Sequence, residues 1–471
     1  MTERFDTIVV GAGVSGLAAA RLLTAAGRRV VLLEARDRVG GRVHTEREHG
    51  RVTDLGASWI HGIADSPLHA VTSGFGMPET EFTVGSYQAG GRPIAYYGPD
   101  GARLDDAAAE RFIADVAAVD AQLVAVIAEA VPGSSYADVS DAAVSAVAVD
   151  QGWDAERAER VTEYLYHRSE EQYGADAVLL DAHGLDDDAI EGDEVVFPDG
   201  YDRLADHLAE GLDVRLEHEV AEVVWGESGV EITARRSAAA EAAGPATVLT
   251  AERAVVTLPI GVLKSGAVRF DPPLPDPVAG AVDALEMNAF EKIFLRFPER
   301  FWEPDVYAIR RQGDAAEWWH SWYDLTGLHG EPTLLTFAAG ECAKQIRDWP
   351  EERVVASVMA ALREIYGESV PDPAHARITH WQDDPYSRGS YAYMTVGSRP
   401  EDHDVIATPL GGTRASSSGG EAAVLHLAGE ATWTEDPATV TAALCSGHRA
   451  AERILGRPLP YSALLGGTGG Y

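Results

Sequence analysis

The chain has 471 residues, of which 46% are hydrophobic and 24% are charged. This composition can bury a sizeable core and excludes intrinsic disorder as the main state. There are 75 acidic residues against 38 Lys and Arg, so the formal net charge is −37. Such a surface repels nucleic acid and anionic membranes and attracts small cations. We expect neither a nucleic-acid nor a membrane partner, and solubility is the simplest use of the charge.

The cysteines and the apolar runs exclude several further classes. Cys342 and Cys445 lie far apart and form no CxxC pair, so neither a disulfide framework nor a cysteine metal site is predicted. The segment Met1–Asp6 lacks the positive charge of a secretory signal. Acidic residues break every apolar run before the ~20 residues of a membrane span. We therefore expect a cytoplasmic protein, monomeric or homodimeric, without a metal.

A strand, a glycine-rich turn and a helix are predicted first in the chain. Asp6–Val10 is a short apolar run rich in β-branched residues, typical of a buried parallel strand. Leu17–Ala26 has helical composition, and Gly27 ends the helix. Arg29–Leu33 is a second buried strand, followed directly by Glu34. Together these elements form a β–α–β unit of about 30 residues.

The turn between the first strand and the helix has the pattern GxGxxG. Gly11 permits the tight turn, Gly13 lets the backbone approach a pyrophosphate, and Gly16 lets helix and strand pack closely. The N–H groups at the helix start, including those of Val14 and Ser15, favour phosphate binding. The pattern predicts a bound dinucleotide, but it does not distinguish NAD from FAD.

The residues after the second strand make that distinction. The carboxylate of Glu34 can accept both hydroxyls of a ribose and disfavours a 2′-phosphate. Two glycines and an arginine follow in the segment Glu34–Arg42 (EARDRVGGR). This turn can bring the Arg42 guanidinium to the pyrophosphate from the opposite side. The extension resembles the flavin amine oxidase family, whose members use FAD.

Further segments resemble motifs of the same family, in the same order along the chain. They are Asp54–Gly62 (DLGASWIHG), Glu219-Val220, Val256–Leu263, Phe290–Phe297 (FEKIFLRF), Trp381 with Gly389–Tyr393, and Gly429–Thr432 with Pro437–Val440. The resemblance extends over nearly the whole chain. Within the family, the polyamine and spermine oxidases are the most similar members.

The resemblance implies an α/β fold with two domains. A discontinuous Rossmann-type FAD-binding domain is predicted for residues 1–72, 195–268 and 405–465. A mixed α+β substrate-binding domain is predicted for residues 73–194 and 269–404. Within it we expect helices at Ala107–Val131 and Ala155–Tyr173 and a second sheet with strands at Phe294–Phe297, Thr333–Phe337 and Ile378–Trp381.

The resemblance also implies which residues contact FAD. They are Gly11, Gly13, Val14, Ser15, Gly16, Glu34, Ala35, Arg36, Gly41, Arg42, Gly56, Ala57, Ser58, Val220, Trp381, Glu430, Thr439 and Val440. The family's mitochondrial-type members attach the flavin to a cysteine in the region that corresponds to Tyr391–Gly412. That region contains no cysteine here, so we expect FAD to be bound non-covalently.

Two residues receive catalytic roles from the resemblance. Lys292, one of only three lysines, lies in a largely apolar segment and would contact flavin N5 through a water molecule. Burial should lower its pKa, so that it could relay a proton or guide oxygen. His61 belongs to a Trp-Ile-His-Gly motif of animal-type members. It would hydrogen-bond a secondary amine and help to keep it neutral, which is the form that gives up hydride.

The same comparison implies the substrate-binding residues. Tyr391 would form one wall of the amine pocket, because the face of a tyrosine ring attracts cations. Thr439 stands where many members place a second aromatic residue, so this side of the pocket departs from the family pattern. Asp176 is predicted to hold the distal ammonium of a polyamine, with Glu170 and Glu171 as alternatives.

We therefore expect an FAD-dependent amine oxidase acting on spermine, spermidine or their acetylated forms, with oxygen as the acceptor. Hydride transfer from the amine to flavin N5 would give an aldehyde, an amine and hydrogen peroxide. One alternative is an oxidase for a monoamine, a biosynthetic intermediate or an amino acid, with Arg310, Arg311 or Arg388 as carboxylate anchor. A second is an FAD-binding protein without turnover. Histone demethylation is not expected, because 471 residues leave no room for extra domains.

Overall fold

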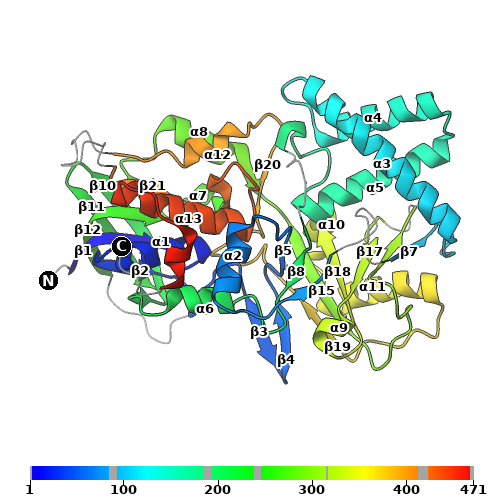
Figure 1. The fold of residues 1–471 in the computed structure, drawn as a ribbon, viewed down its shortest axis with the longest axis horizontal. Helices are drawn as coiled ribbons and strands as arrows, with labels where there is room; N and C mark the ends of the chain where they lie inside the picture. The colour runs from blue at the N-terminus through cyan, green and yellow to red at the C-terminus, as the bar shows by residue number, and fades with distance from the viewer. Residues whose placement is uncertain are drawn as a thin grey trace.

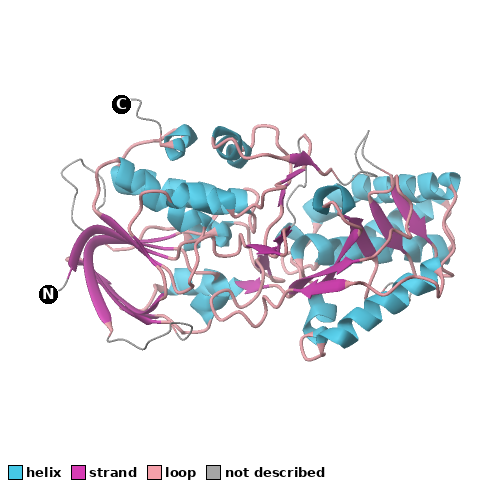
Figure 2. Ribbon diagram, turned by 90° about the horizontal axis from the view of Figure 1, so that it is seen from below, coloured by secondary structure: helices cyan, strands magenta, loops and turns pink. Residues whose placement is uncertain are grey.

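The structure is a computed structural model that describes residues 3–83, 93–184, 192–237, 246–313, 317–411 and 423–466. It is elongated, with an eight-stranded sheet at one end and a six-stranded sheet at the other (Figure 1). Helices pack on both sheets, and shorter strands lie between them (Figure 2). This arrangement confirms the predicted α/β fold. Among the described residues, no helix is long and apolar enough to cross a membrane.

The eight-stranded sheet is built from three separate parts of the chain. Its strands are β1 (Glu3–Val10), β2 (Val30–Leu33), β9 (Val214–Arg215), β10 (His218–Gly226), β11 (Gly229–Arg236), β12 (Thr247–Val256), β13 (Arg269–Asp271) and β21 (Leu425–Leu427). β1 pairs in parallel with β2 and β12, and β12 pairs in parallel with β21. β11 lies between β10 and β12 and pairs with both of them in antiparallel orientation.

The second sheet has the strand order β19-β15-β18-β17-β16-β7. Its strands are β7 (Ile94–Tyr97), β15 (Phe290–Arg296), β16 (Ala308–Arg311), β17 (Ser321–Asp324), β18 (Thr333–Ala339) and β19 (His375–Ile378). The three predicted strands correspond to β15, β18 and β19, which are neighbours. The range Ile378–Trp381 was wrong, because the strand ends at Ile378 and the chain then turns, with Gly389 N–H donating to Trp381 O.

Thirteen α-helices are present in the described residues. They are α1 (Val14–Ala25), α2 (Pro67–Gly74), α3 (Asp106–Glu129), α4 (Tyr136–Gln151), α5 (Ala155–Tyr173), α6 (Arg203–Ala209), α7 (Ile260–Lys264), α8 (Asp276–Ala284), α9 (Thr326–His329), α10 (Gly340–Ile346), α11 (Glu351–Tyr366), α12 (Glu401–Ile406) and α13 (Val440–Leu455). The predicted helix over Ala155–Tyr173 is confirmed at both ends, where Asp154 caps it and Gly174 adopts a left-handed conformation.

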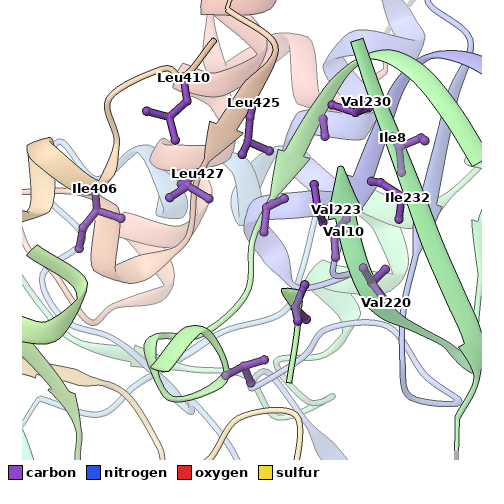
Figure 3. Packing of buried hydrophobic residues seen from close by; sticks show 14 of the residues in the cluster. Ile8, Val10, Val220, Val223, Val230, Ile232, Ile406, Leu410, Leu425 and Leu427 are labelled. Carbon is purple, nitrogen blue, oxygen red and sulfur yellow. The ribbon is translucent and has the colours of Figure 1, made fainter. Parts of the chain in front are cut away.

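The central parallel strands β1 and β2 of the first sheet are buried on both faces, as expected for such strands. Val9 of β1 packs with helices α1, α6 and α13 on one face. α13 crosses α1 so closely that a side chain at Gly447 would clash with the backbone oxygen of Ser15. On the other face, Ile8 and Val10 pack with residues of β10, β11 and β21 (Figure 3). The two layers hold the carboxyl ends of β1 and β2 in place, where the glycine turn begins.

Short strands connect the two large sheets. They are β3 (Thr45–Glu48), β4 (Arg51–Asp54), β5 (Trp59–Ile60), β6 (Thr80–Glu81), β8 (Val195–Val196), β14 (Leu285–Met287) and β20 (Ala392–Met394). β5, β8 and β6 form a three-stranded antiparallel sheet near the middle of the molecule (Figure 1). None of these strands was predicted, because two to four residues show too little periodicity.

Candidate functional site

The glycine turn after β1 has the geometry that a pyrophosphate requires. Gly11 has φ +98°, and Gly16 lies so close to Gly11 that a side chain there would clash with its backbone oxygen. Neither position admits another residue without a shift of the backbone. A side chain at Gly13, in contrast, would meet no atom within 4 Å. The turn is therefore tight on its protein side and open on the side where α1 begins, with Val14 and Ser15 in its first turn.

Glu34 lies beside this turn at the end of β2. Its carboxylate is buried and accepts hydrogen bonds from Ala12 N at 2.8 Å and from Arg36 N at 2.9 Å. These bonds hold the carboxylate at the position predicted for the ribose acid, next to Ala35. The Arg36 guanidinium pairs with Asp384 at 2.6 Å. Asp384 was missed by the sequence analysis, since it comes from a turn 348 residues later.

The second glycine pair lies directly on the first turn. Gly40 N–H donates to Ala12 O at 2.8 Å, and Gly41 has φ +59°. A side chain at Gly41 would come within 3.3 Å of the Gly13 Cα atom. The two turns thus form one backbone cradle. Val220, also predicted to contact the cofactor, is buried on β10, whose first residue, His218, donates its N–H to Glu34 O at 2.7 Å.

Arg42 and Glu430 meet across the site from opposite ends of the chain. Arg42 Nη1 lies 2.8 Å from Glu430 Oε1 and 3.0 Å from Ser390 O. Glu430 is only 5% exposed, and its second oxygen, Oε2, has no hydrogen-bond partner in the described part of the chain. A buried acceptor without a partner is costly unless a ligand or water satisfies it. A cofactor hydroxyl fits this position, so the residues present suit a dinucleotide such as FAD.

Lys292 lies on β15, between β19 and β18, and is 6% exposed. Its Nζ donates to Gly56 O at 2.6 Å, Ser58 Oγ at 2.5 Å and Asp54 O at 3.2 Å. Three acceptors match the three protons of an ammonium group. Burial nevertheless lowers the pKa of Lys292 to about 8, with the Asp54 carboxylate opposing the shift. The lysine is thus held against the turn Asp54–Ser58, which includes Ala57.

Asp54 is a second titratable group at this turn that the sequence analysis did not single out. Burial raises its pKa to about 6, although hydrogen bonds from Thr45 and Tyr201 N and the charge of Lys292 oppose the change. Thr45 Oγ1 lies 2.5 Å from its carboxylate. Its place at the start of the DLGAS motif, as the last residue of β4, was the available signal.

Trp381 is buried beside the same turn. Its ring N–H donates to Leu55 O at 3.0 Å, and its backbone N–H donates to Glu291 at 3.0 Å. Glu291 also accepts from Thr379 Oγ1 at 2.6 Å and from Gln382 N at 3.1 Å. Burial raises the pKa of Glu291, and these hydrogen bonds oppose the shift. Glu291 therefore fixes the backbone that carries Trp381, a role that its position next to Lys292 did not reveal.

His61 reaches the Lys292 region through an aromatic contact. The His61 ring stacks on Trp59 with 6.3 Å between centroids and 15° between planes. Lys292 Nζ lies 5.4 Å from the centroid of the Trp59 ring. His61 Nδ1 lies 2.5 Å from a carboxylate oxygen of Glu194, and the His61 side chain is 55% exposed. The two residues predicted to be catalytic thus both contact one indole ring.

Tyr391 belongs to an aromatic layer next to Lys292. Its ring lies 5.7 Å from Phe290, which lies 4.8 Å from Phe337, the residue opposite Lys292 in the β15–β18 pairing. Phe337 in turn lies 5.5 Å from Tyr323. Burial raises the pKa of Tyr391, and its hydroxyl donates to Gln172 O at 3.1 Å. The layer offers several ring faces to a cation.

Beyond this layer, Glu170 and Glu171 are engaged with protein cations. Arg310 lies 2.9 Å from Glu171, and His320 lies 3.2 Å from Glu171 and 3.7 Å from Glu170. Burial alone would lower the pKa of His320, but the two carboxylates outweigh it and raise the pKa to about 9. The pKa of Glu171 is lowered, because Arg310 and His320 outweigh its burial. Neither acid is therefore an uncompensated charge.

His167, Glu170 and His320 approach one another closely enough for a metal, but their geometry does not suit one. The two imidazoles stack with 3.9 Å between centroids and 5° between planes. Nitrogen lone pairs lie in the plane of each ring, so those of parallel rings cannot converge on one ion. The stack instead pairs a protonated His320 with His167, whose pKa is lowered by burial and by His320.

Three other predicted site residues have structural contacts. Asp176 Oδ1 accepts the N–H of Glu341 at 3.1 Å, in the first turn of α10. Thr439 is the N-cap of α13, which begins at Val440: its Oγ1 accepts from Ala442 N at 3.0 Å. Arg311 pairs with Glu364 at 2.6 Å.

This arrangement defines a dinucleotide-binding oxidoreductase with a buried lysine and an aromatic layer. A family profile described as flavin containing amine oxidoreductase matches residues 14–455. The chain belongs to this family. Its cofactor is FAD, which the glycine cradle, Glu34 and the second oxygen of Glu430 fit.

The named relatives include both a histone demethylase homologue and a polyamine oxidase. Lysine-specific histone demethylase 1 homolog 3 of Oryza sativa subsp. japonica is 31% identical over 96% of this chain and 54% of its own length. Polyamine oxidase 2 of Arabidopsis thaliana is 30% identical over 96% of this chain and 88% of its own length. The chain therefore spans about half the length of the demethylase, and similarity does not separate the two substrate classes.

A solved structure of putrescine oxidase with bound putrescine has the same fold. It superposes with a TM-score of 0.74 at 22% identity, over 97% of this chain and 100% of its own. Together with the family match, this likeness confirms the predicted fold class.

Proposed function

We propose that the protein is an FAD-dependent amine oxidase and that its substrate is a small cationic amine of the polyamine class. The observation that carries the proposal is Lys292, a buried lysine held against the Asp54–Ser58 turn by three hydrogen bonds. Its Nζ lies 5.4 Å from the ring centroid of Trp59, and Phe290, on the same strand, packs on Tyr391. Ring faces attract alkylammonium groups, and the named polyamine oxidase relative supports the choice of substrate.

The residues at this site would have separate roles in binding the cofactor and in proton transfer. FAD, when bound, supplies a hydride acceptor for the carbon next to the amine nitrogen. Arg42 and Glu430 would hold its pyrophosphate and its hydroxyls, with Val440 and the start of α13 near the ring system. Lys292 would provide a proton or a positive charge for oxygen, and His61 would accept a proton from the amine. The predicted domain boundaries and non-covalent attachment belong to this proposal.

The amino acid alternative has less support from the arginines named for it. Arg310 forms an ion pair with Glu171, and Arg311 forms one with Glu364. Arg388 is exposed at the surface and adopts a positive φ of 57°. A carboxylate anchor at any of these positions would need an existing pairing to break or an exposed side chain to turn inward. An amine without a carboxylate therefore suits the site better.

The deciding experiment is an anaerobic substrate screen on the purified protein. A flavin absorbance spectrum comes first, and acid precipitation should release the flavin into the supernatant. Spermine, acetylspermine, putrescine, a monoamine, an amino acid and a dimethyl-lysine peptide are then tested for bleaching of the flavin. Bleaching by polyamines, with peroxide formed in air, is the expected result. Bleaching only by the peptide or only by the amino acid would overturn the substrate, and no bleaching would favour a binding protein.

A further inference from the structure

The short strands β5 and β8 bring two side chains together that no motif connects. Trp59 pairs with Val196 and Ile60 with Val195 in an antiparallel register. The next pair in that register is His61 and Glu194. Residues directly opposite in such a pair have Cβ atoms about 5 Å apart, so their side chains can meet. His61 Nδ1 and Glu194 Oε1 lie 2.5 Å apart.

The two members of this pair differ in exposure. Glu194 is 4% exposed, and its backbone is fixed on both sides: its N–H donates to Thr83 Oγ1 at 3.0 Å, and its oxygen accepts from Phe82 N at 2.8 Å. The His61 side chain is 55% exposed and stacks on Trp59, the ring whose centroid lies 5.4 Å from Lys292 Nζ. A rigid buried carboxylate therefore orients a partly exposed imidazole.

Two other acidic residues on the neighbouring segments have backbone contacts of their own. Glu81 on β6 accepts the backbone N–H of Thr83 at 2.6 Å. Asp193, which precedes Glu194, is exposed, and its backbone oxygen accepts from Ile63 N. Lys292 Nζ lies 5.4 Å from the centroid of the Trp59 ring. Glu194 is a buried carboxylate in direct contact with the imidazole.

We propose that Glu194 is a positioning residue that holds His61 with its proton on Nδ1, so that Nε2 acts as the base toward the substrate ammonium. The inference rests on the proposed amine oxidase function. In the step, an N–H bond of the ammonium breaks and an Nε2–H bond forms. The nitrogen keeps its electron pair as a neutral amine, and the proton later passes from the exposed imidazole to water. A carboxylate on the opposite ring nitrogen fixes the tautomer and stabilises the imidazolium.

The first test is structural and needs no substrate. Protein labelled with ¹⁵N-histidine is compared by NMR with a His61→Asn variant, which identifies the His61 signals. The expected result is an Nδ1–H tautomer of neutral His61 in the unmodified protein. In Glu194→Leu, which offers no hydrogen-bond acceptor to Nδ1–H, the population of the Nε2–H tautomer should increase. An Nε2–H tautomer in the unmodified protein would overturn the proposal.

The second test uses the pH dependence of kcat/KM for an amine that the screen identifies. Glu194→Gln removes the charge that stabilises the imidazolium, so His61 loses its proton more easily and the acidic limb should move to lower pH. Glu194→Leu should lower kcat/KM by about tenfold or more, with unchanged flavin content. Asp193→Asn, which removes a neighbouring exposed carboxylate, should leave both the limb and the rate unchanged.

The two tests separate this inference from the proposed function. If no amine is oxidised, the proposed function fails, while the tautomer still shows whether Glu194 positions His61. If amines are oxidised and Glu194→Gln behaves like Asp193→Asn, the positioning role is wrong although the enzyme is an amine oxidase. Should Glu194→Leu fail to fold, the unmodified protein's tautomer and the Glu194→Gln profile decide the matter.

Discussion

At the scale of single residues, Lys292 has the clearest expected effect. Its ammonium is buried against the Asp54–Ser58 turn, and burial lowers its pKa to about 8. Reduction of oxygen places negative charge in the site, which a nearby cation favours. We expect Lys292→Met to keep flavin bound and to slow flavin reoxidation, measured by stopped flow. In the unmodified protein, reoxidation should slow as pH rises through about 8, and the variant should lack this dependence.

The matched control is Lys264→Met, which removes a lysine that contacts Leu285 O at 2.9 Å and Glu286, away from this turn. It should leave reoxidation unchanged. Equal rates of both half-reactions in Lys292→Met and the unmodified protein would exclude Lys292 from the chemistry.

His320 should affect stability in a pH-dependent way. Its pKa is raised from 6.5 to about 9, so the stabilisation is complete below pH 6.5 and is lost as pH rises through about 9. His320→Gln should therefore destabilise the protein by on the order of 2–4 kcal/mol near pH 6 and by much less above pH 9. Denaturant unfolding at several pH values measures this. His167→Gln removes a histidine that stays neutral in the folded protein, because burial and His320 lower its pKa, so its stability change should be constant above its ordinary pKa of 6.5 and should differ only at lower pH. A loss in His320→Gln that does not shrink as the pH rises through about 9 would contradict the assignment.

The residues that sequence could predict are those whose chemistry needs a local motif. Gly11, Gly13 and Glu34 belong to one short segment, so spacing alone suggested their roles, and their geometry is that of a pyrophosphate cradle. Glu194 and His320 act through partners more than 100 positions away. Nothing in the sequence near either residue shows the pairing, since it depends on strand register and on helix packing.

At the scale of elements, the same difference separates the long strands from the short ones. The β1–α1–β2 unit and α5 were predicted because their apolar pattern and end signals agree over many residues. The three-stranded sheet of β5, β8 and β6 joins segments more than 100 residues apart with two residues each. No periodicity exists in so short a strand, although this sheet places His61.

The start of α13 explains why threonine occupies position 439. Thr439 Oγ1 accepts the N–H of Ala442 and donates to Asp436 O at 2.8 Å, which an aromatic side chain cannot do. We expect Thr439→Val to destabilise the protein by about 1 kcal/mol, while Thr439→Ser retains the cap and the stability. Chemical denaturation of both variants measures the difference. A stable Thr439→Val with a raised KM would instead assign the side chain to the substrate wall.

At the scale of the whole molecule, the net charge of −37 should act on a polycationic substrate. A negative field raises the encounter rate of a cation, and salt screens that field over about 8 Å at physiological ionic strength. If spermine is a substrate, its kcat/KM should fall several-fold between low and high salt, because salt weakens the electrostatic steering of the substrate. A monoamine with a single charge is the internal control and should respond much less. Steered binding changes association, so kcat should stay constant while KM rises. If kcat/KM for spermine does not depend on salt, or depends on it equally for both amines, the acidic surface does not steer the substrate and serves only to keep the protein soluble.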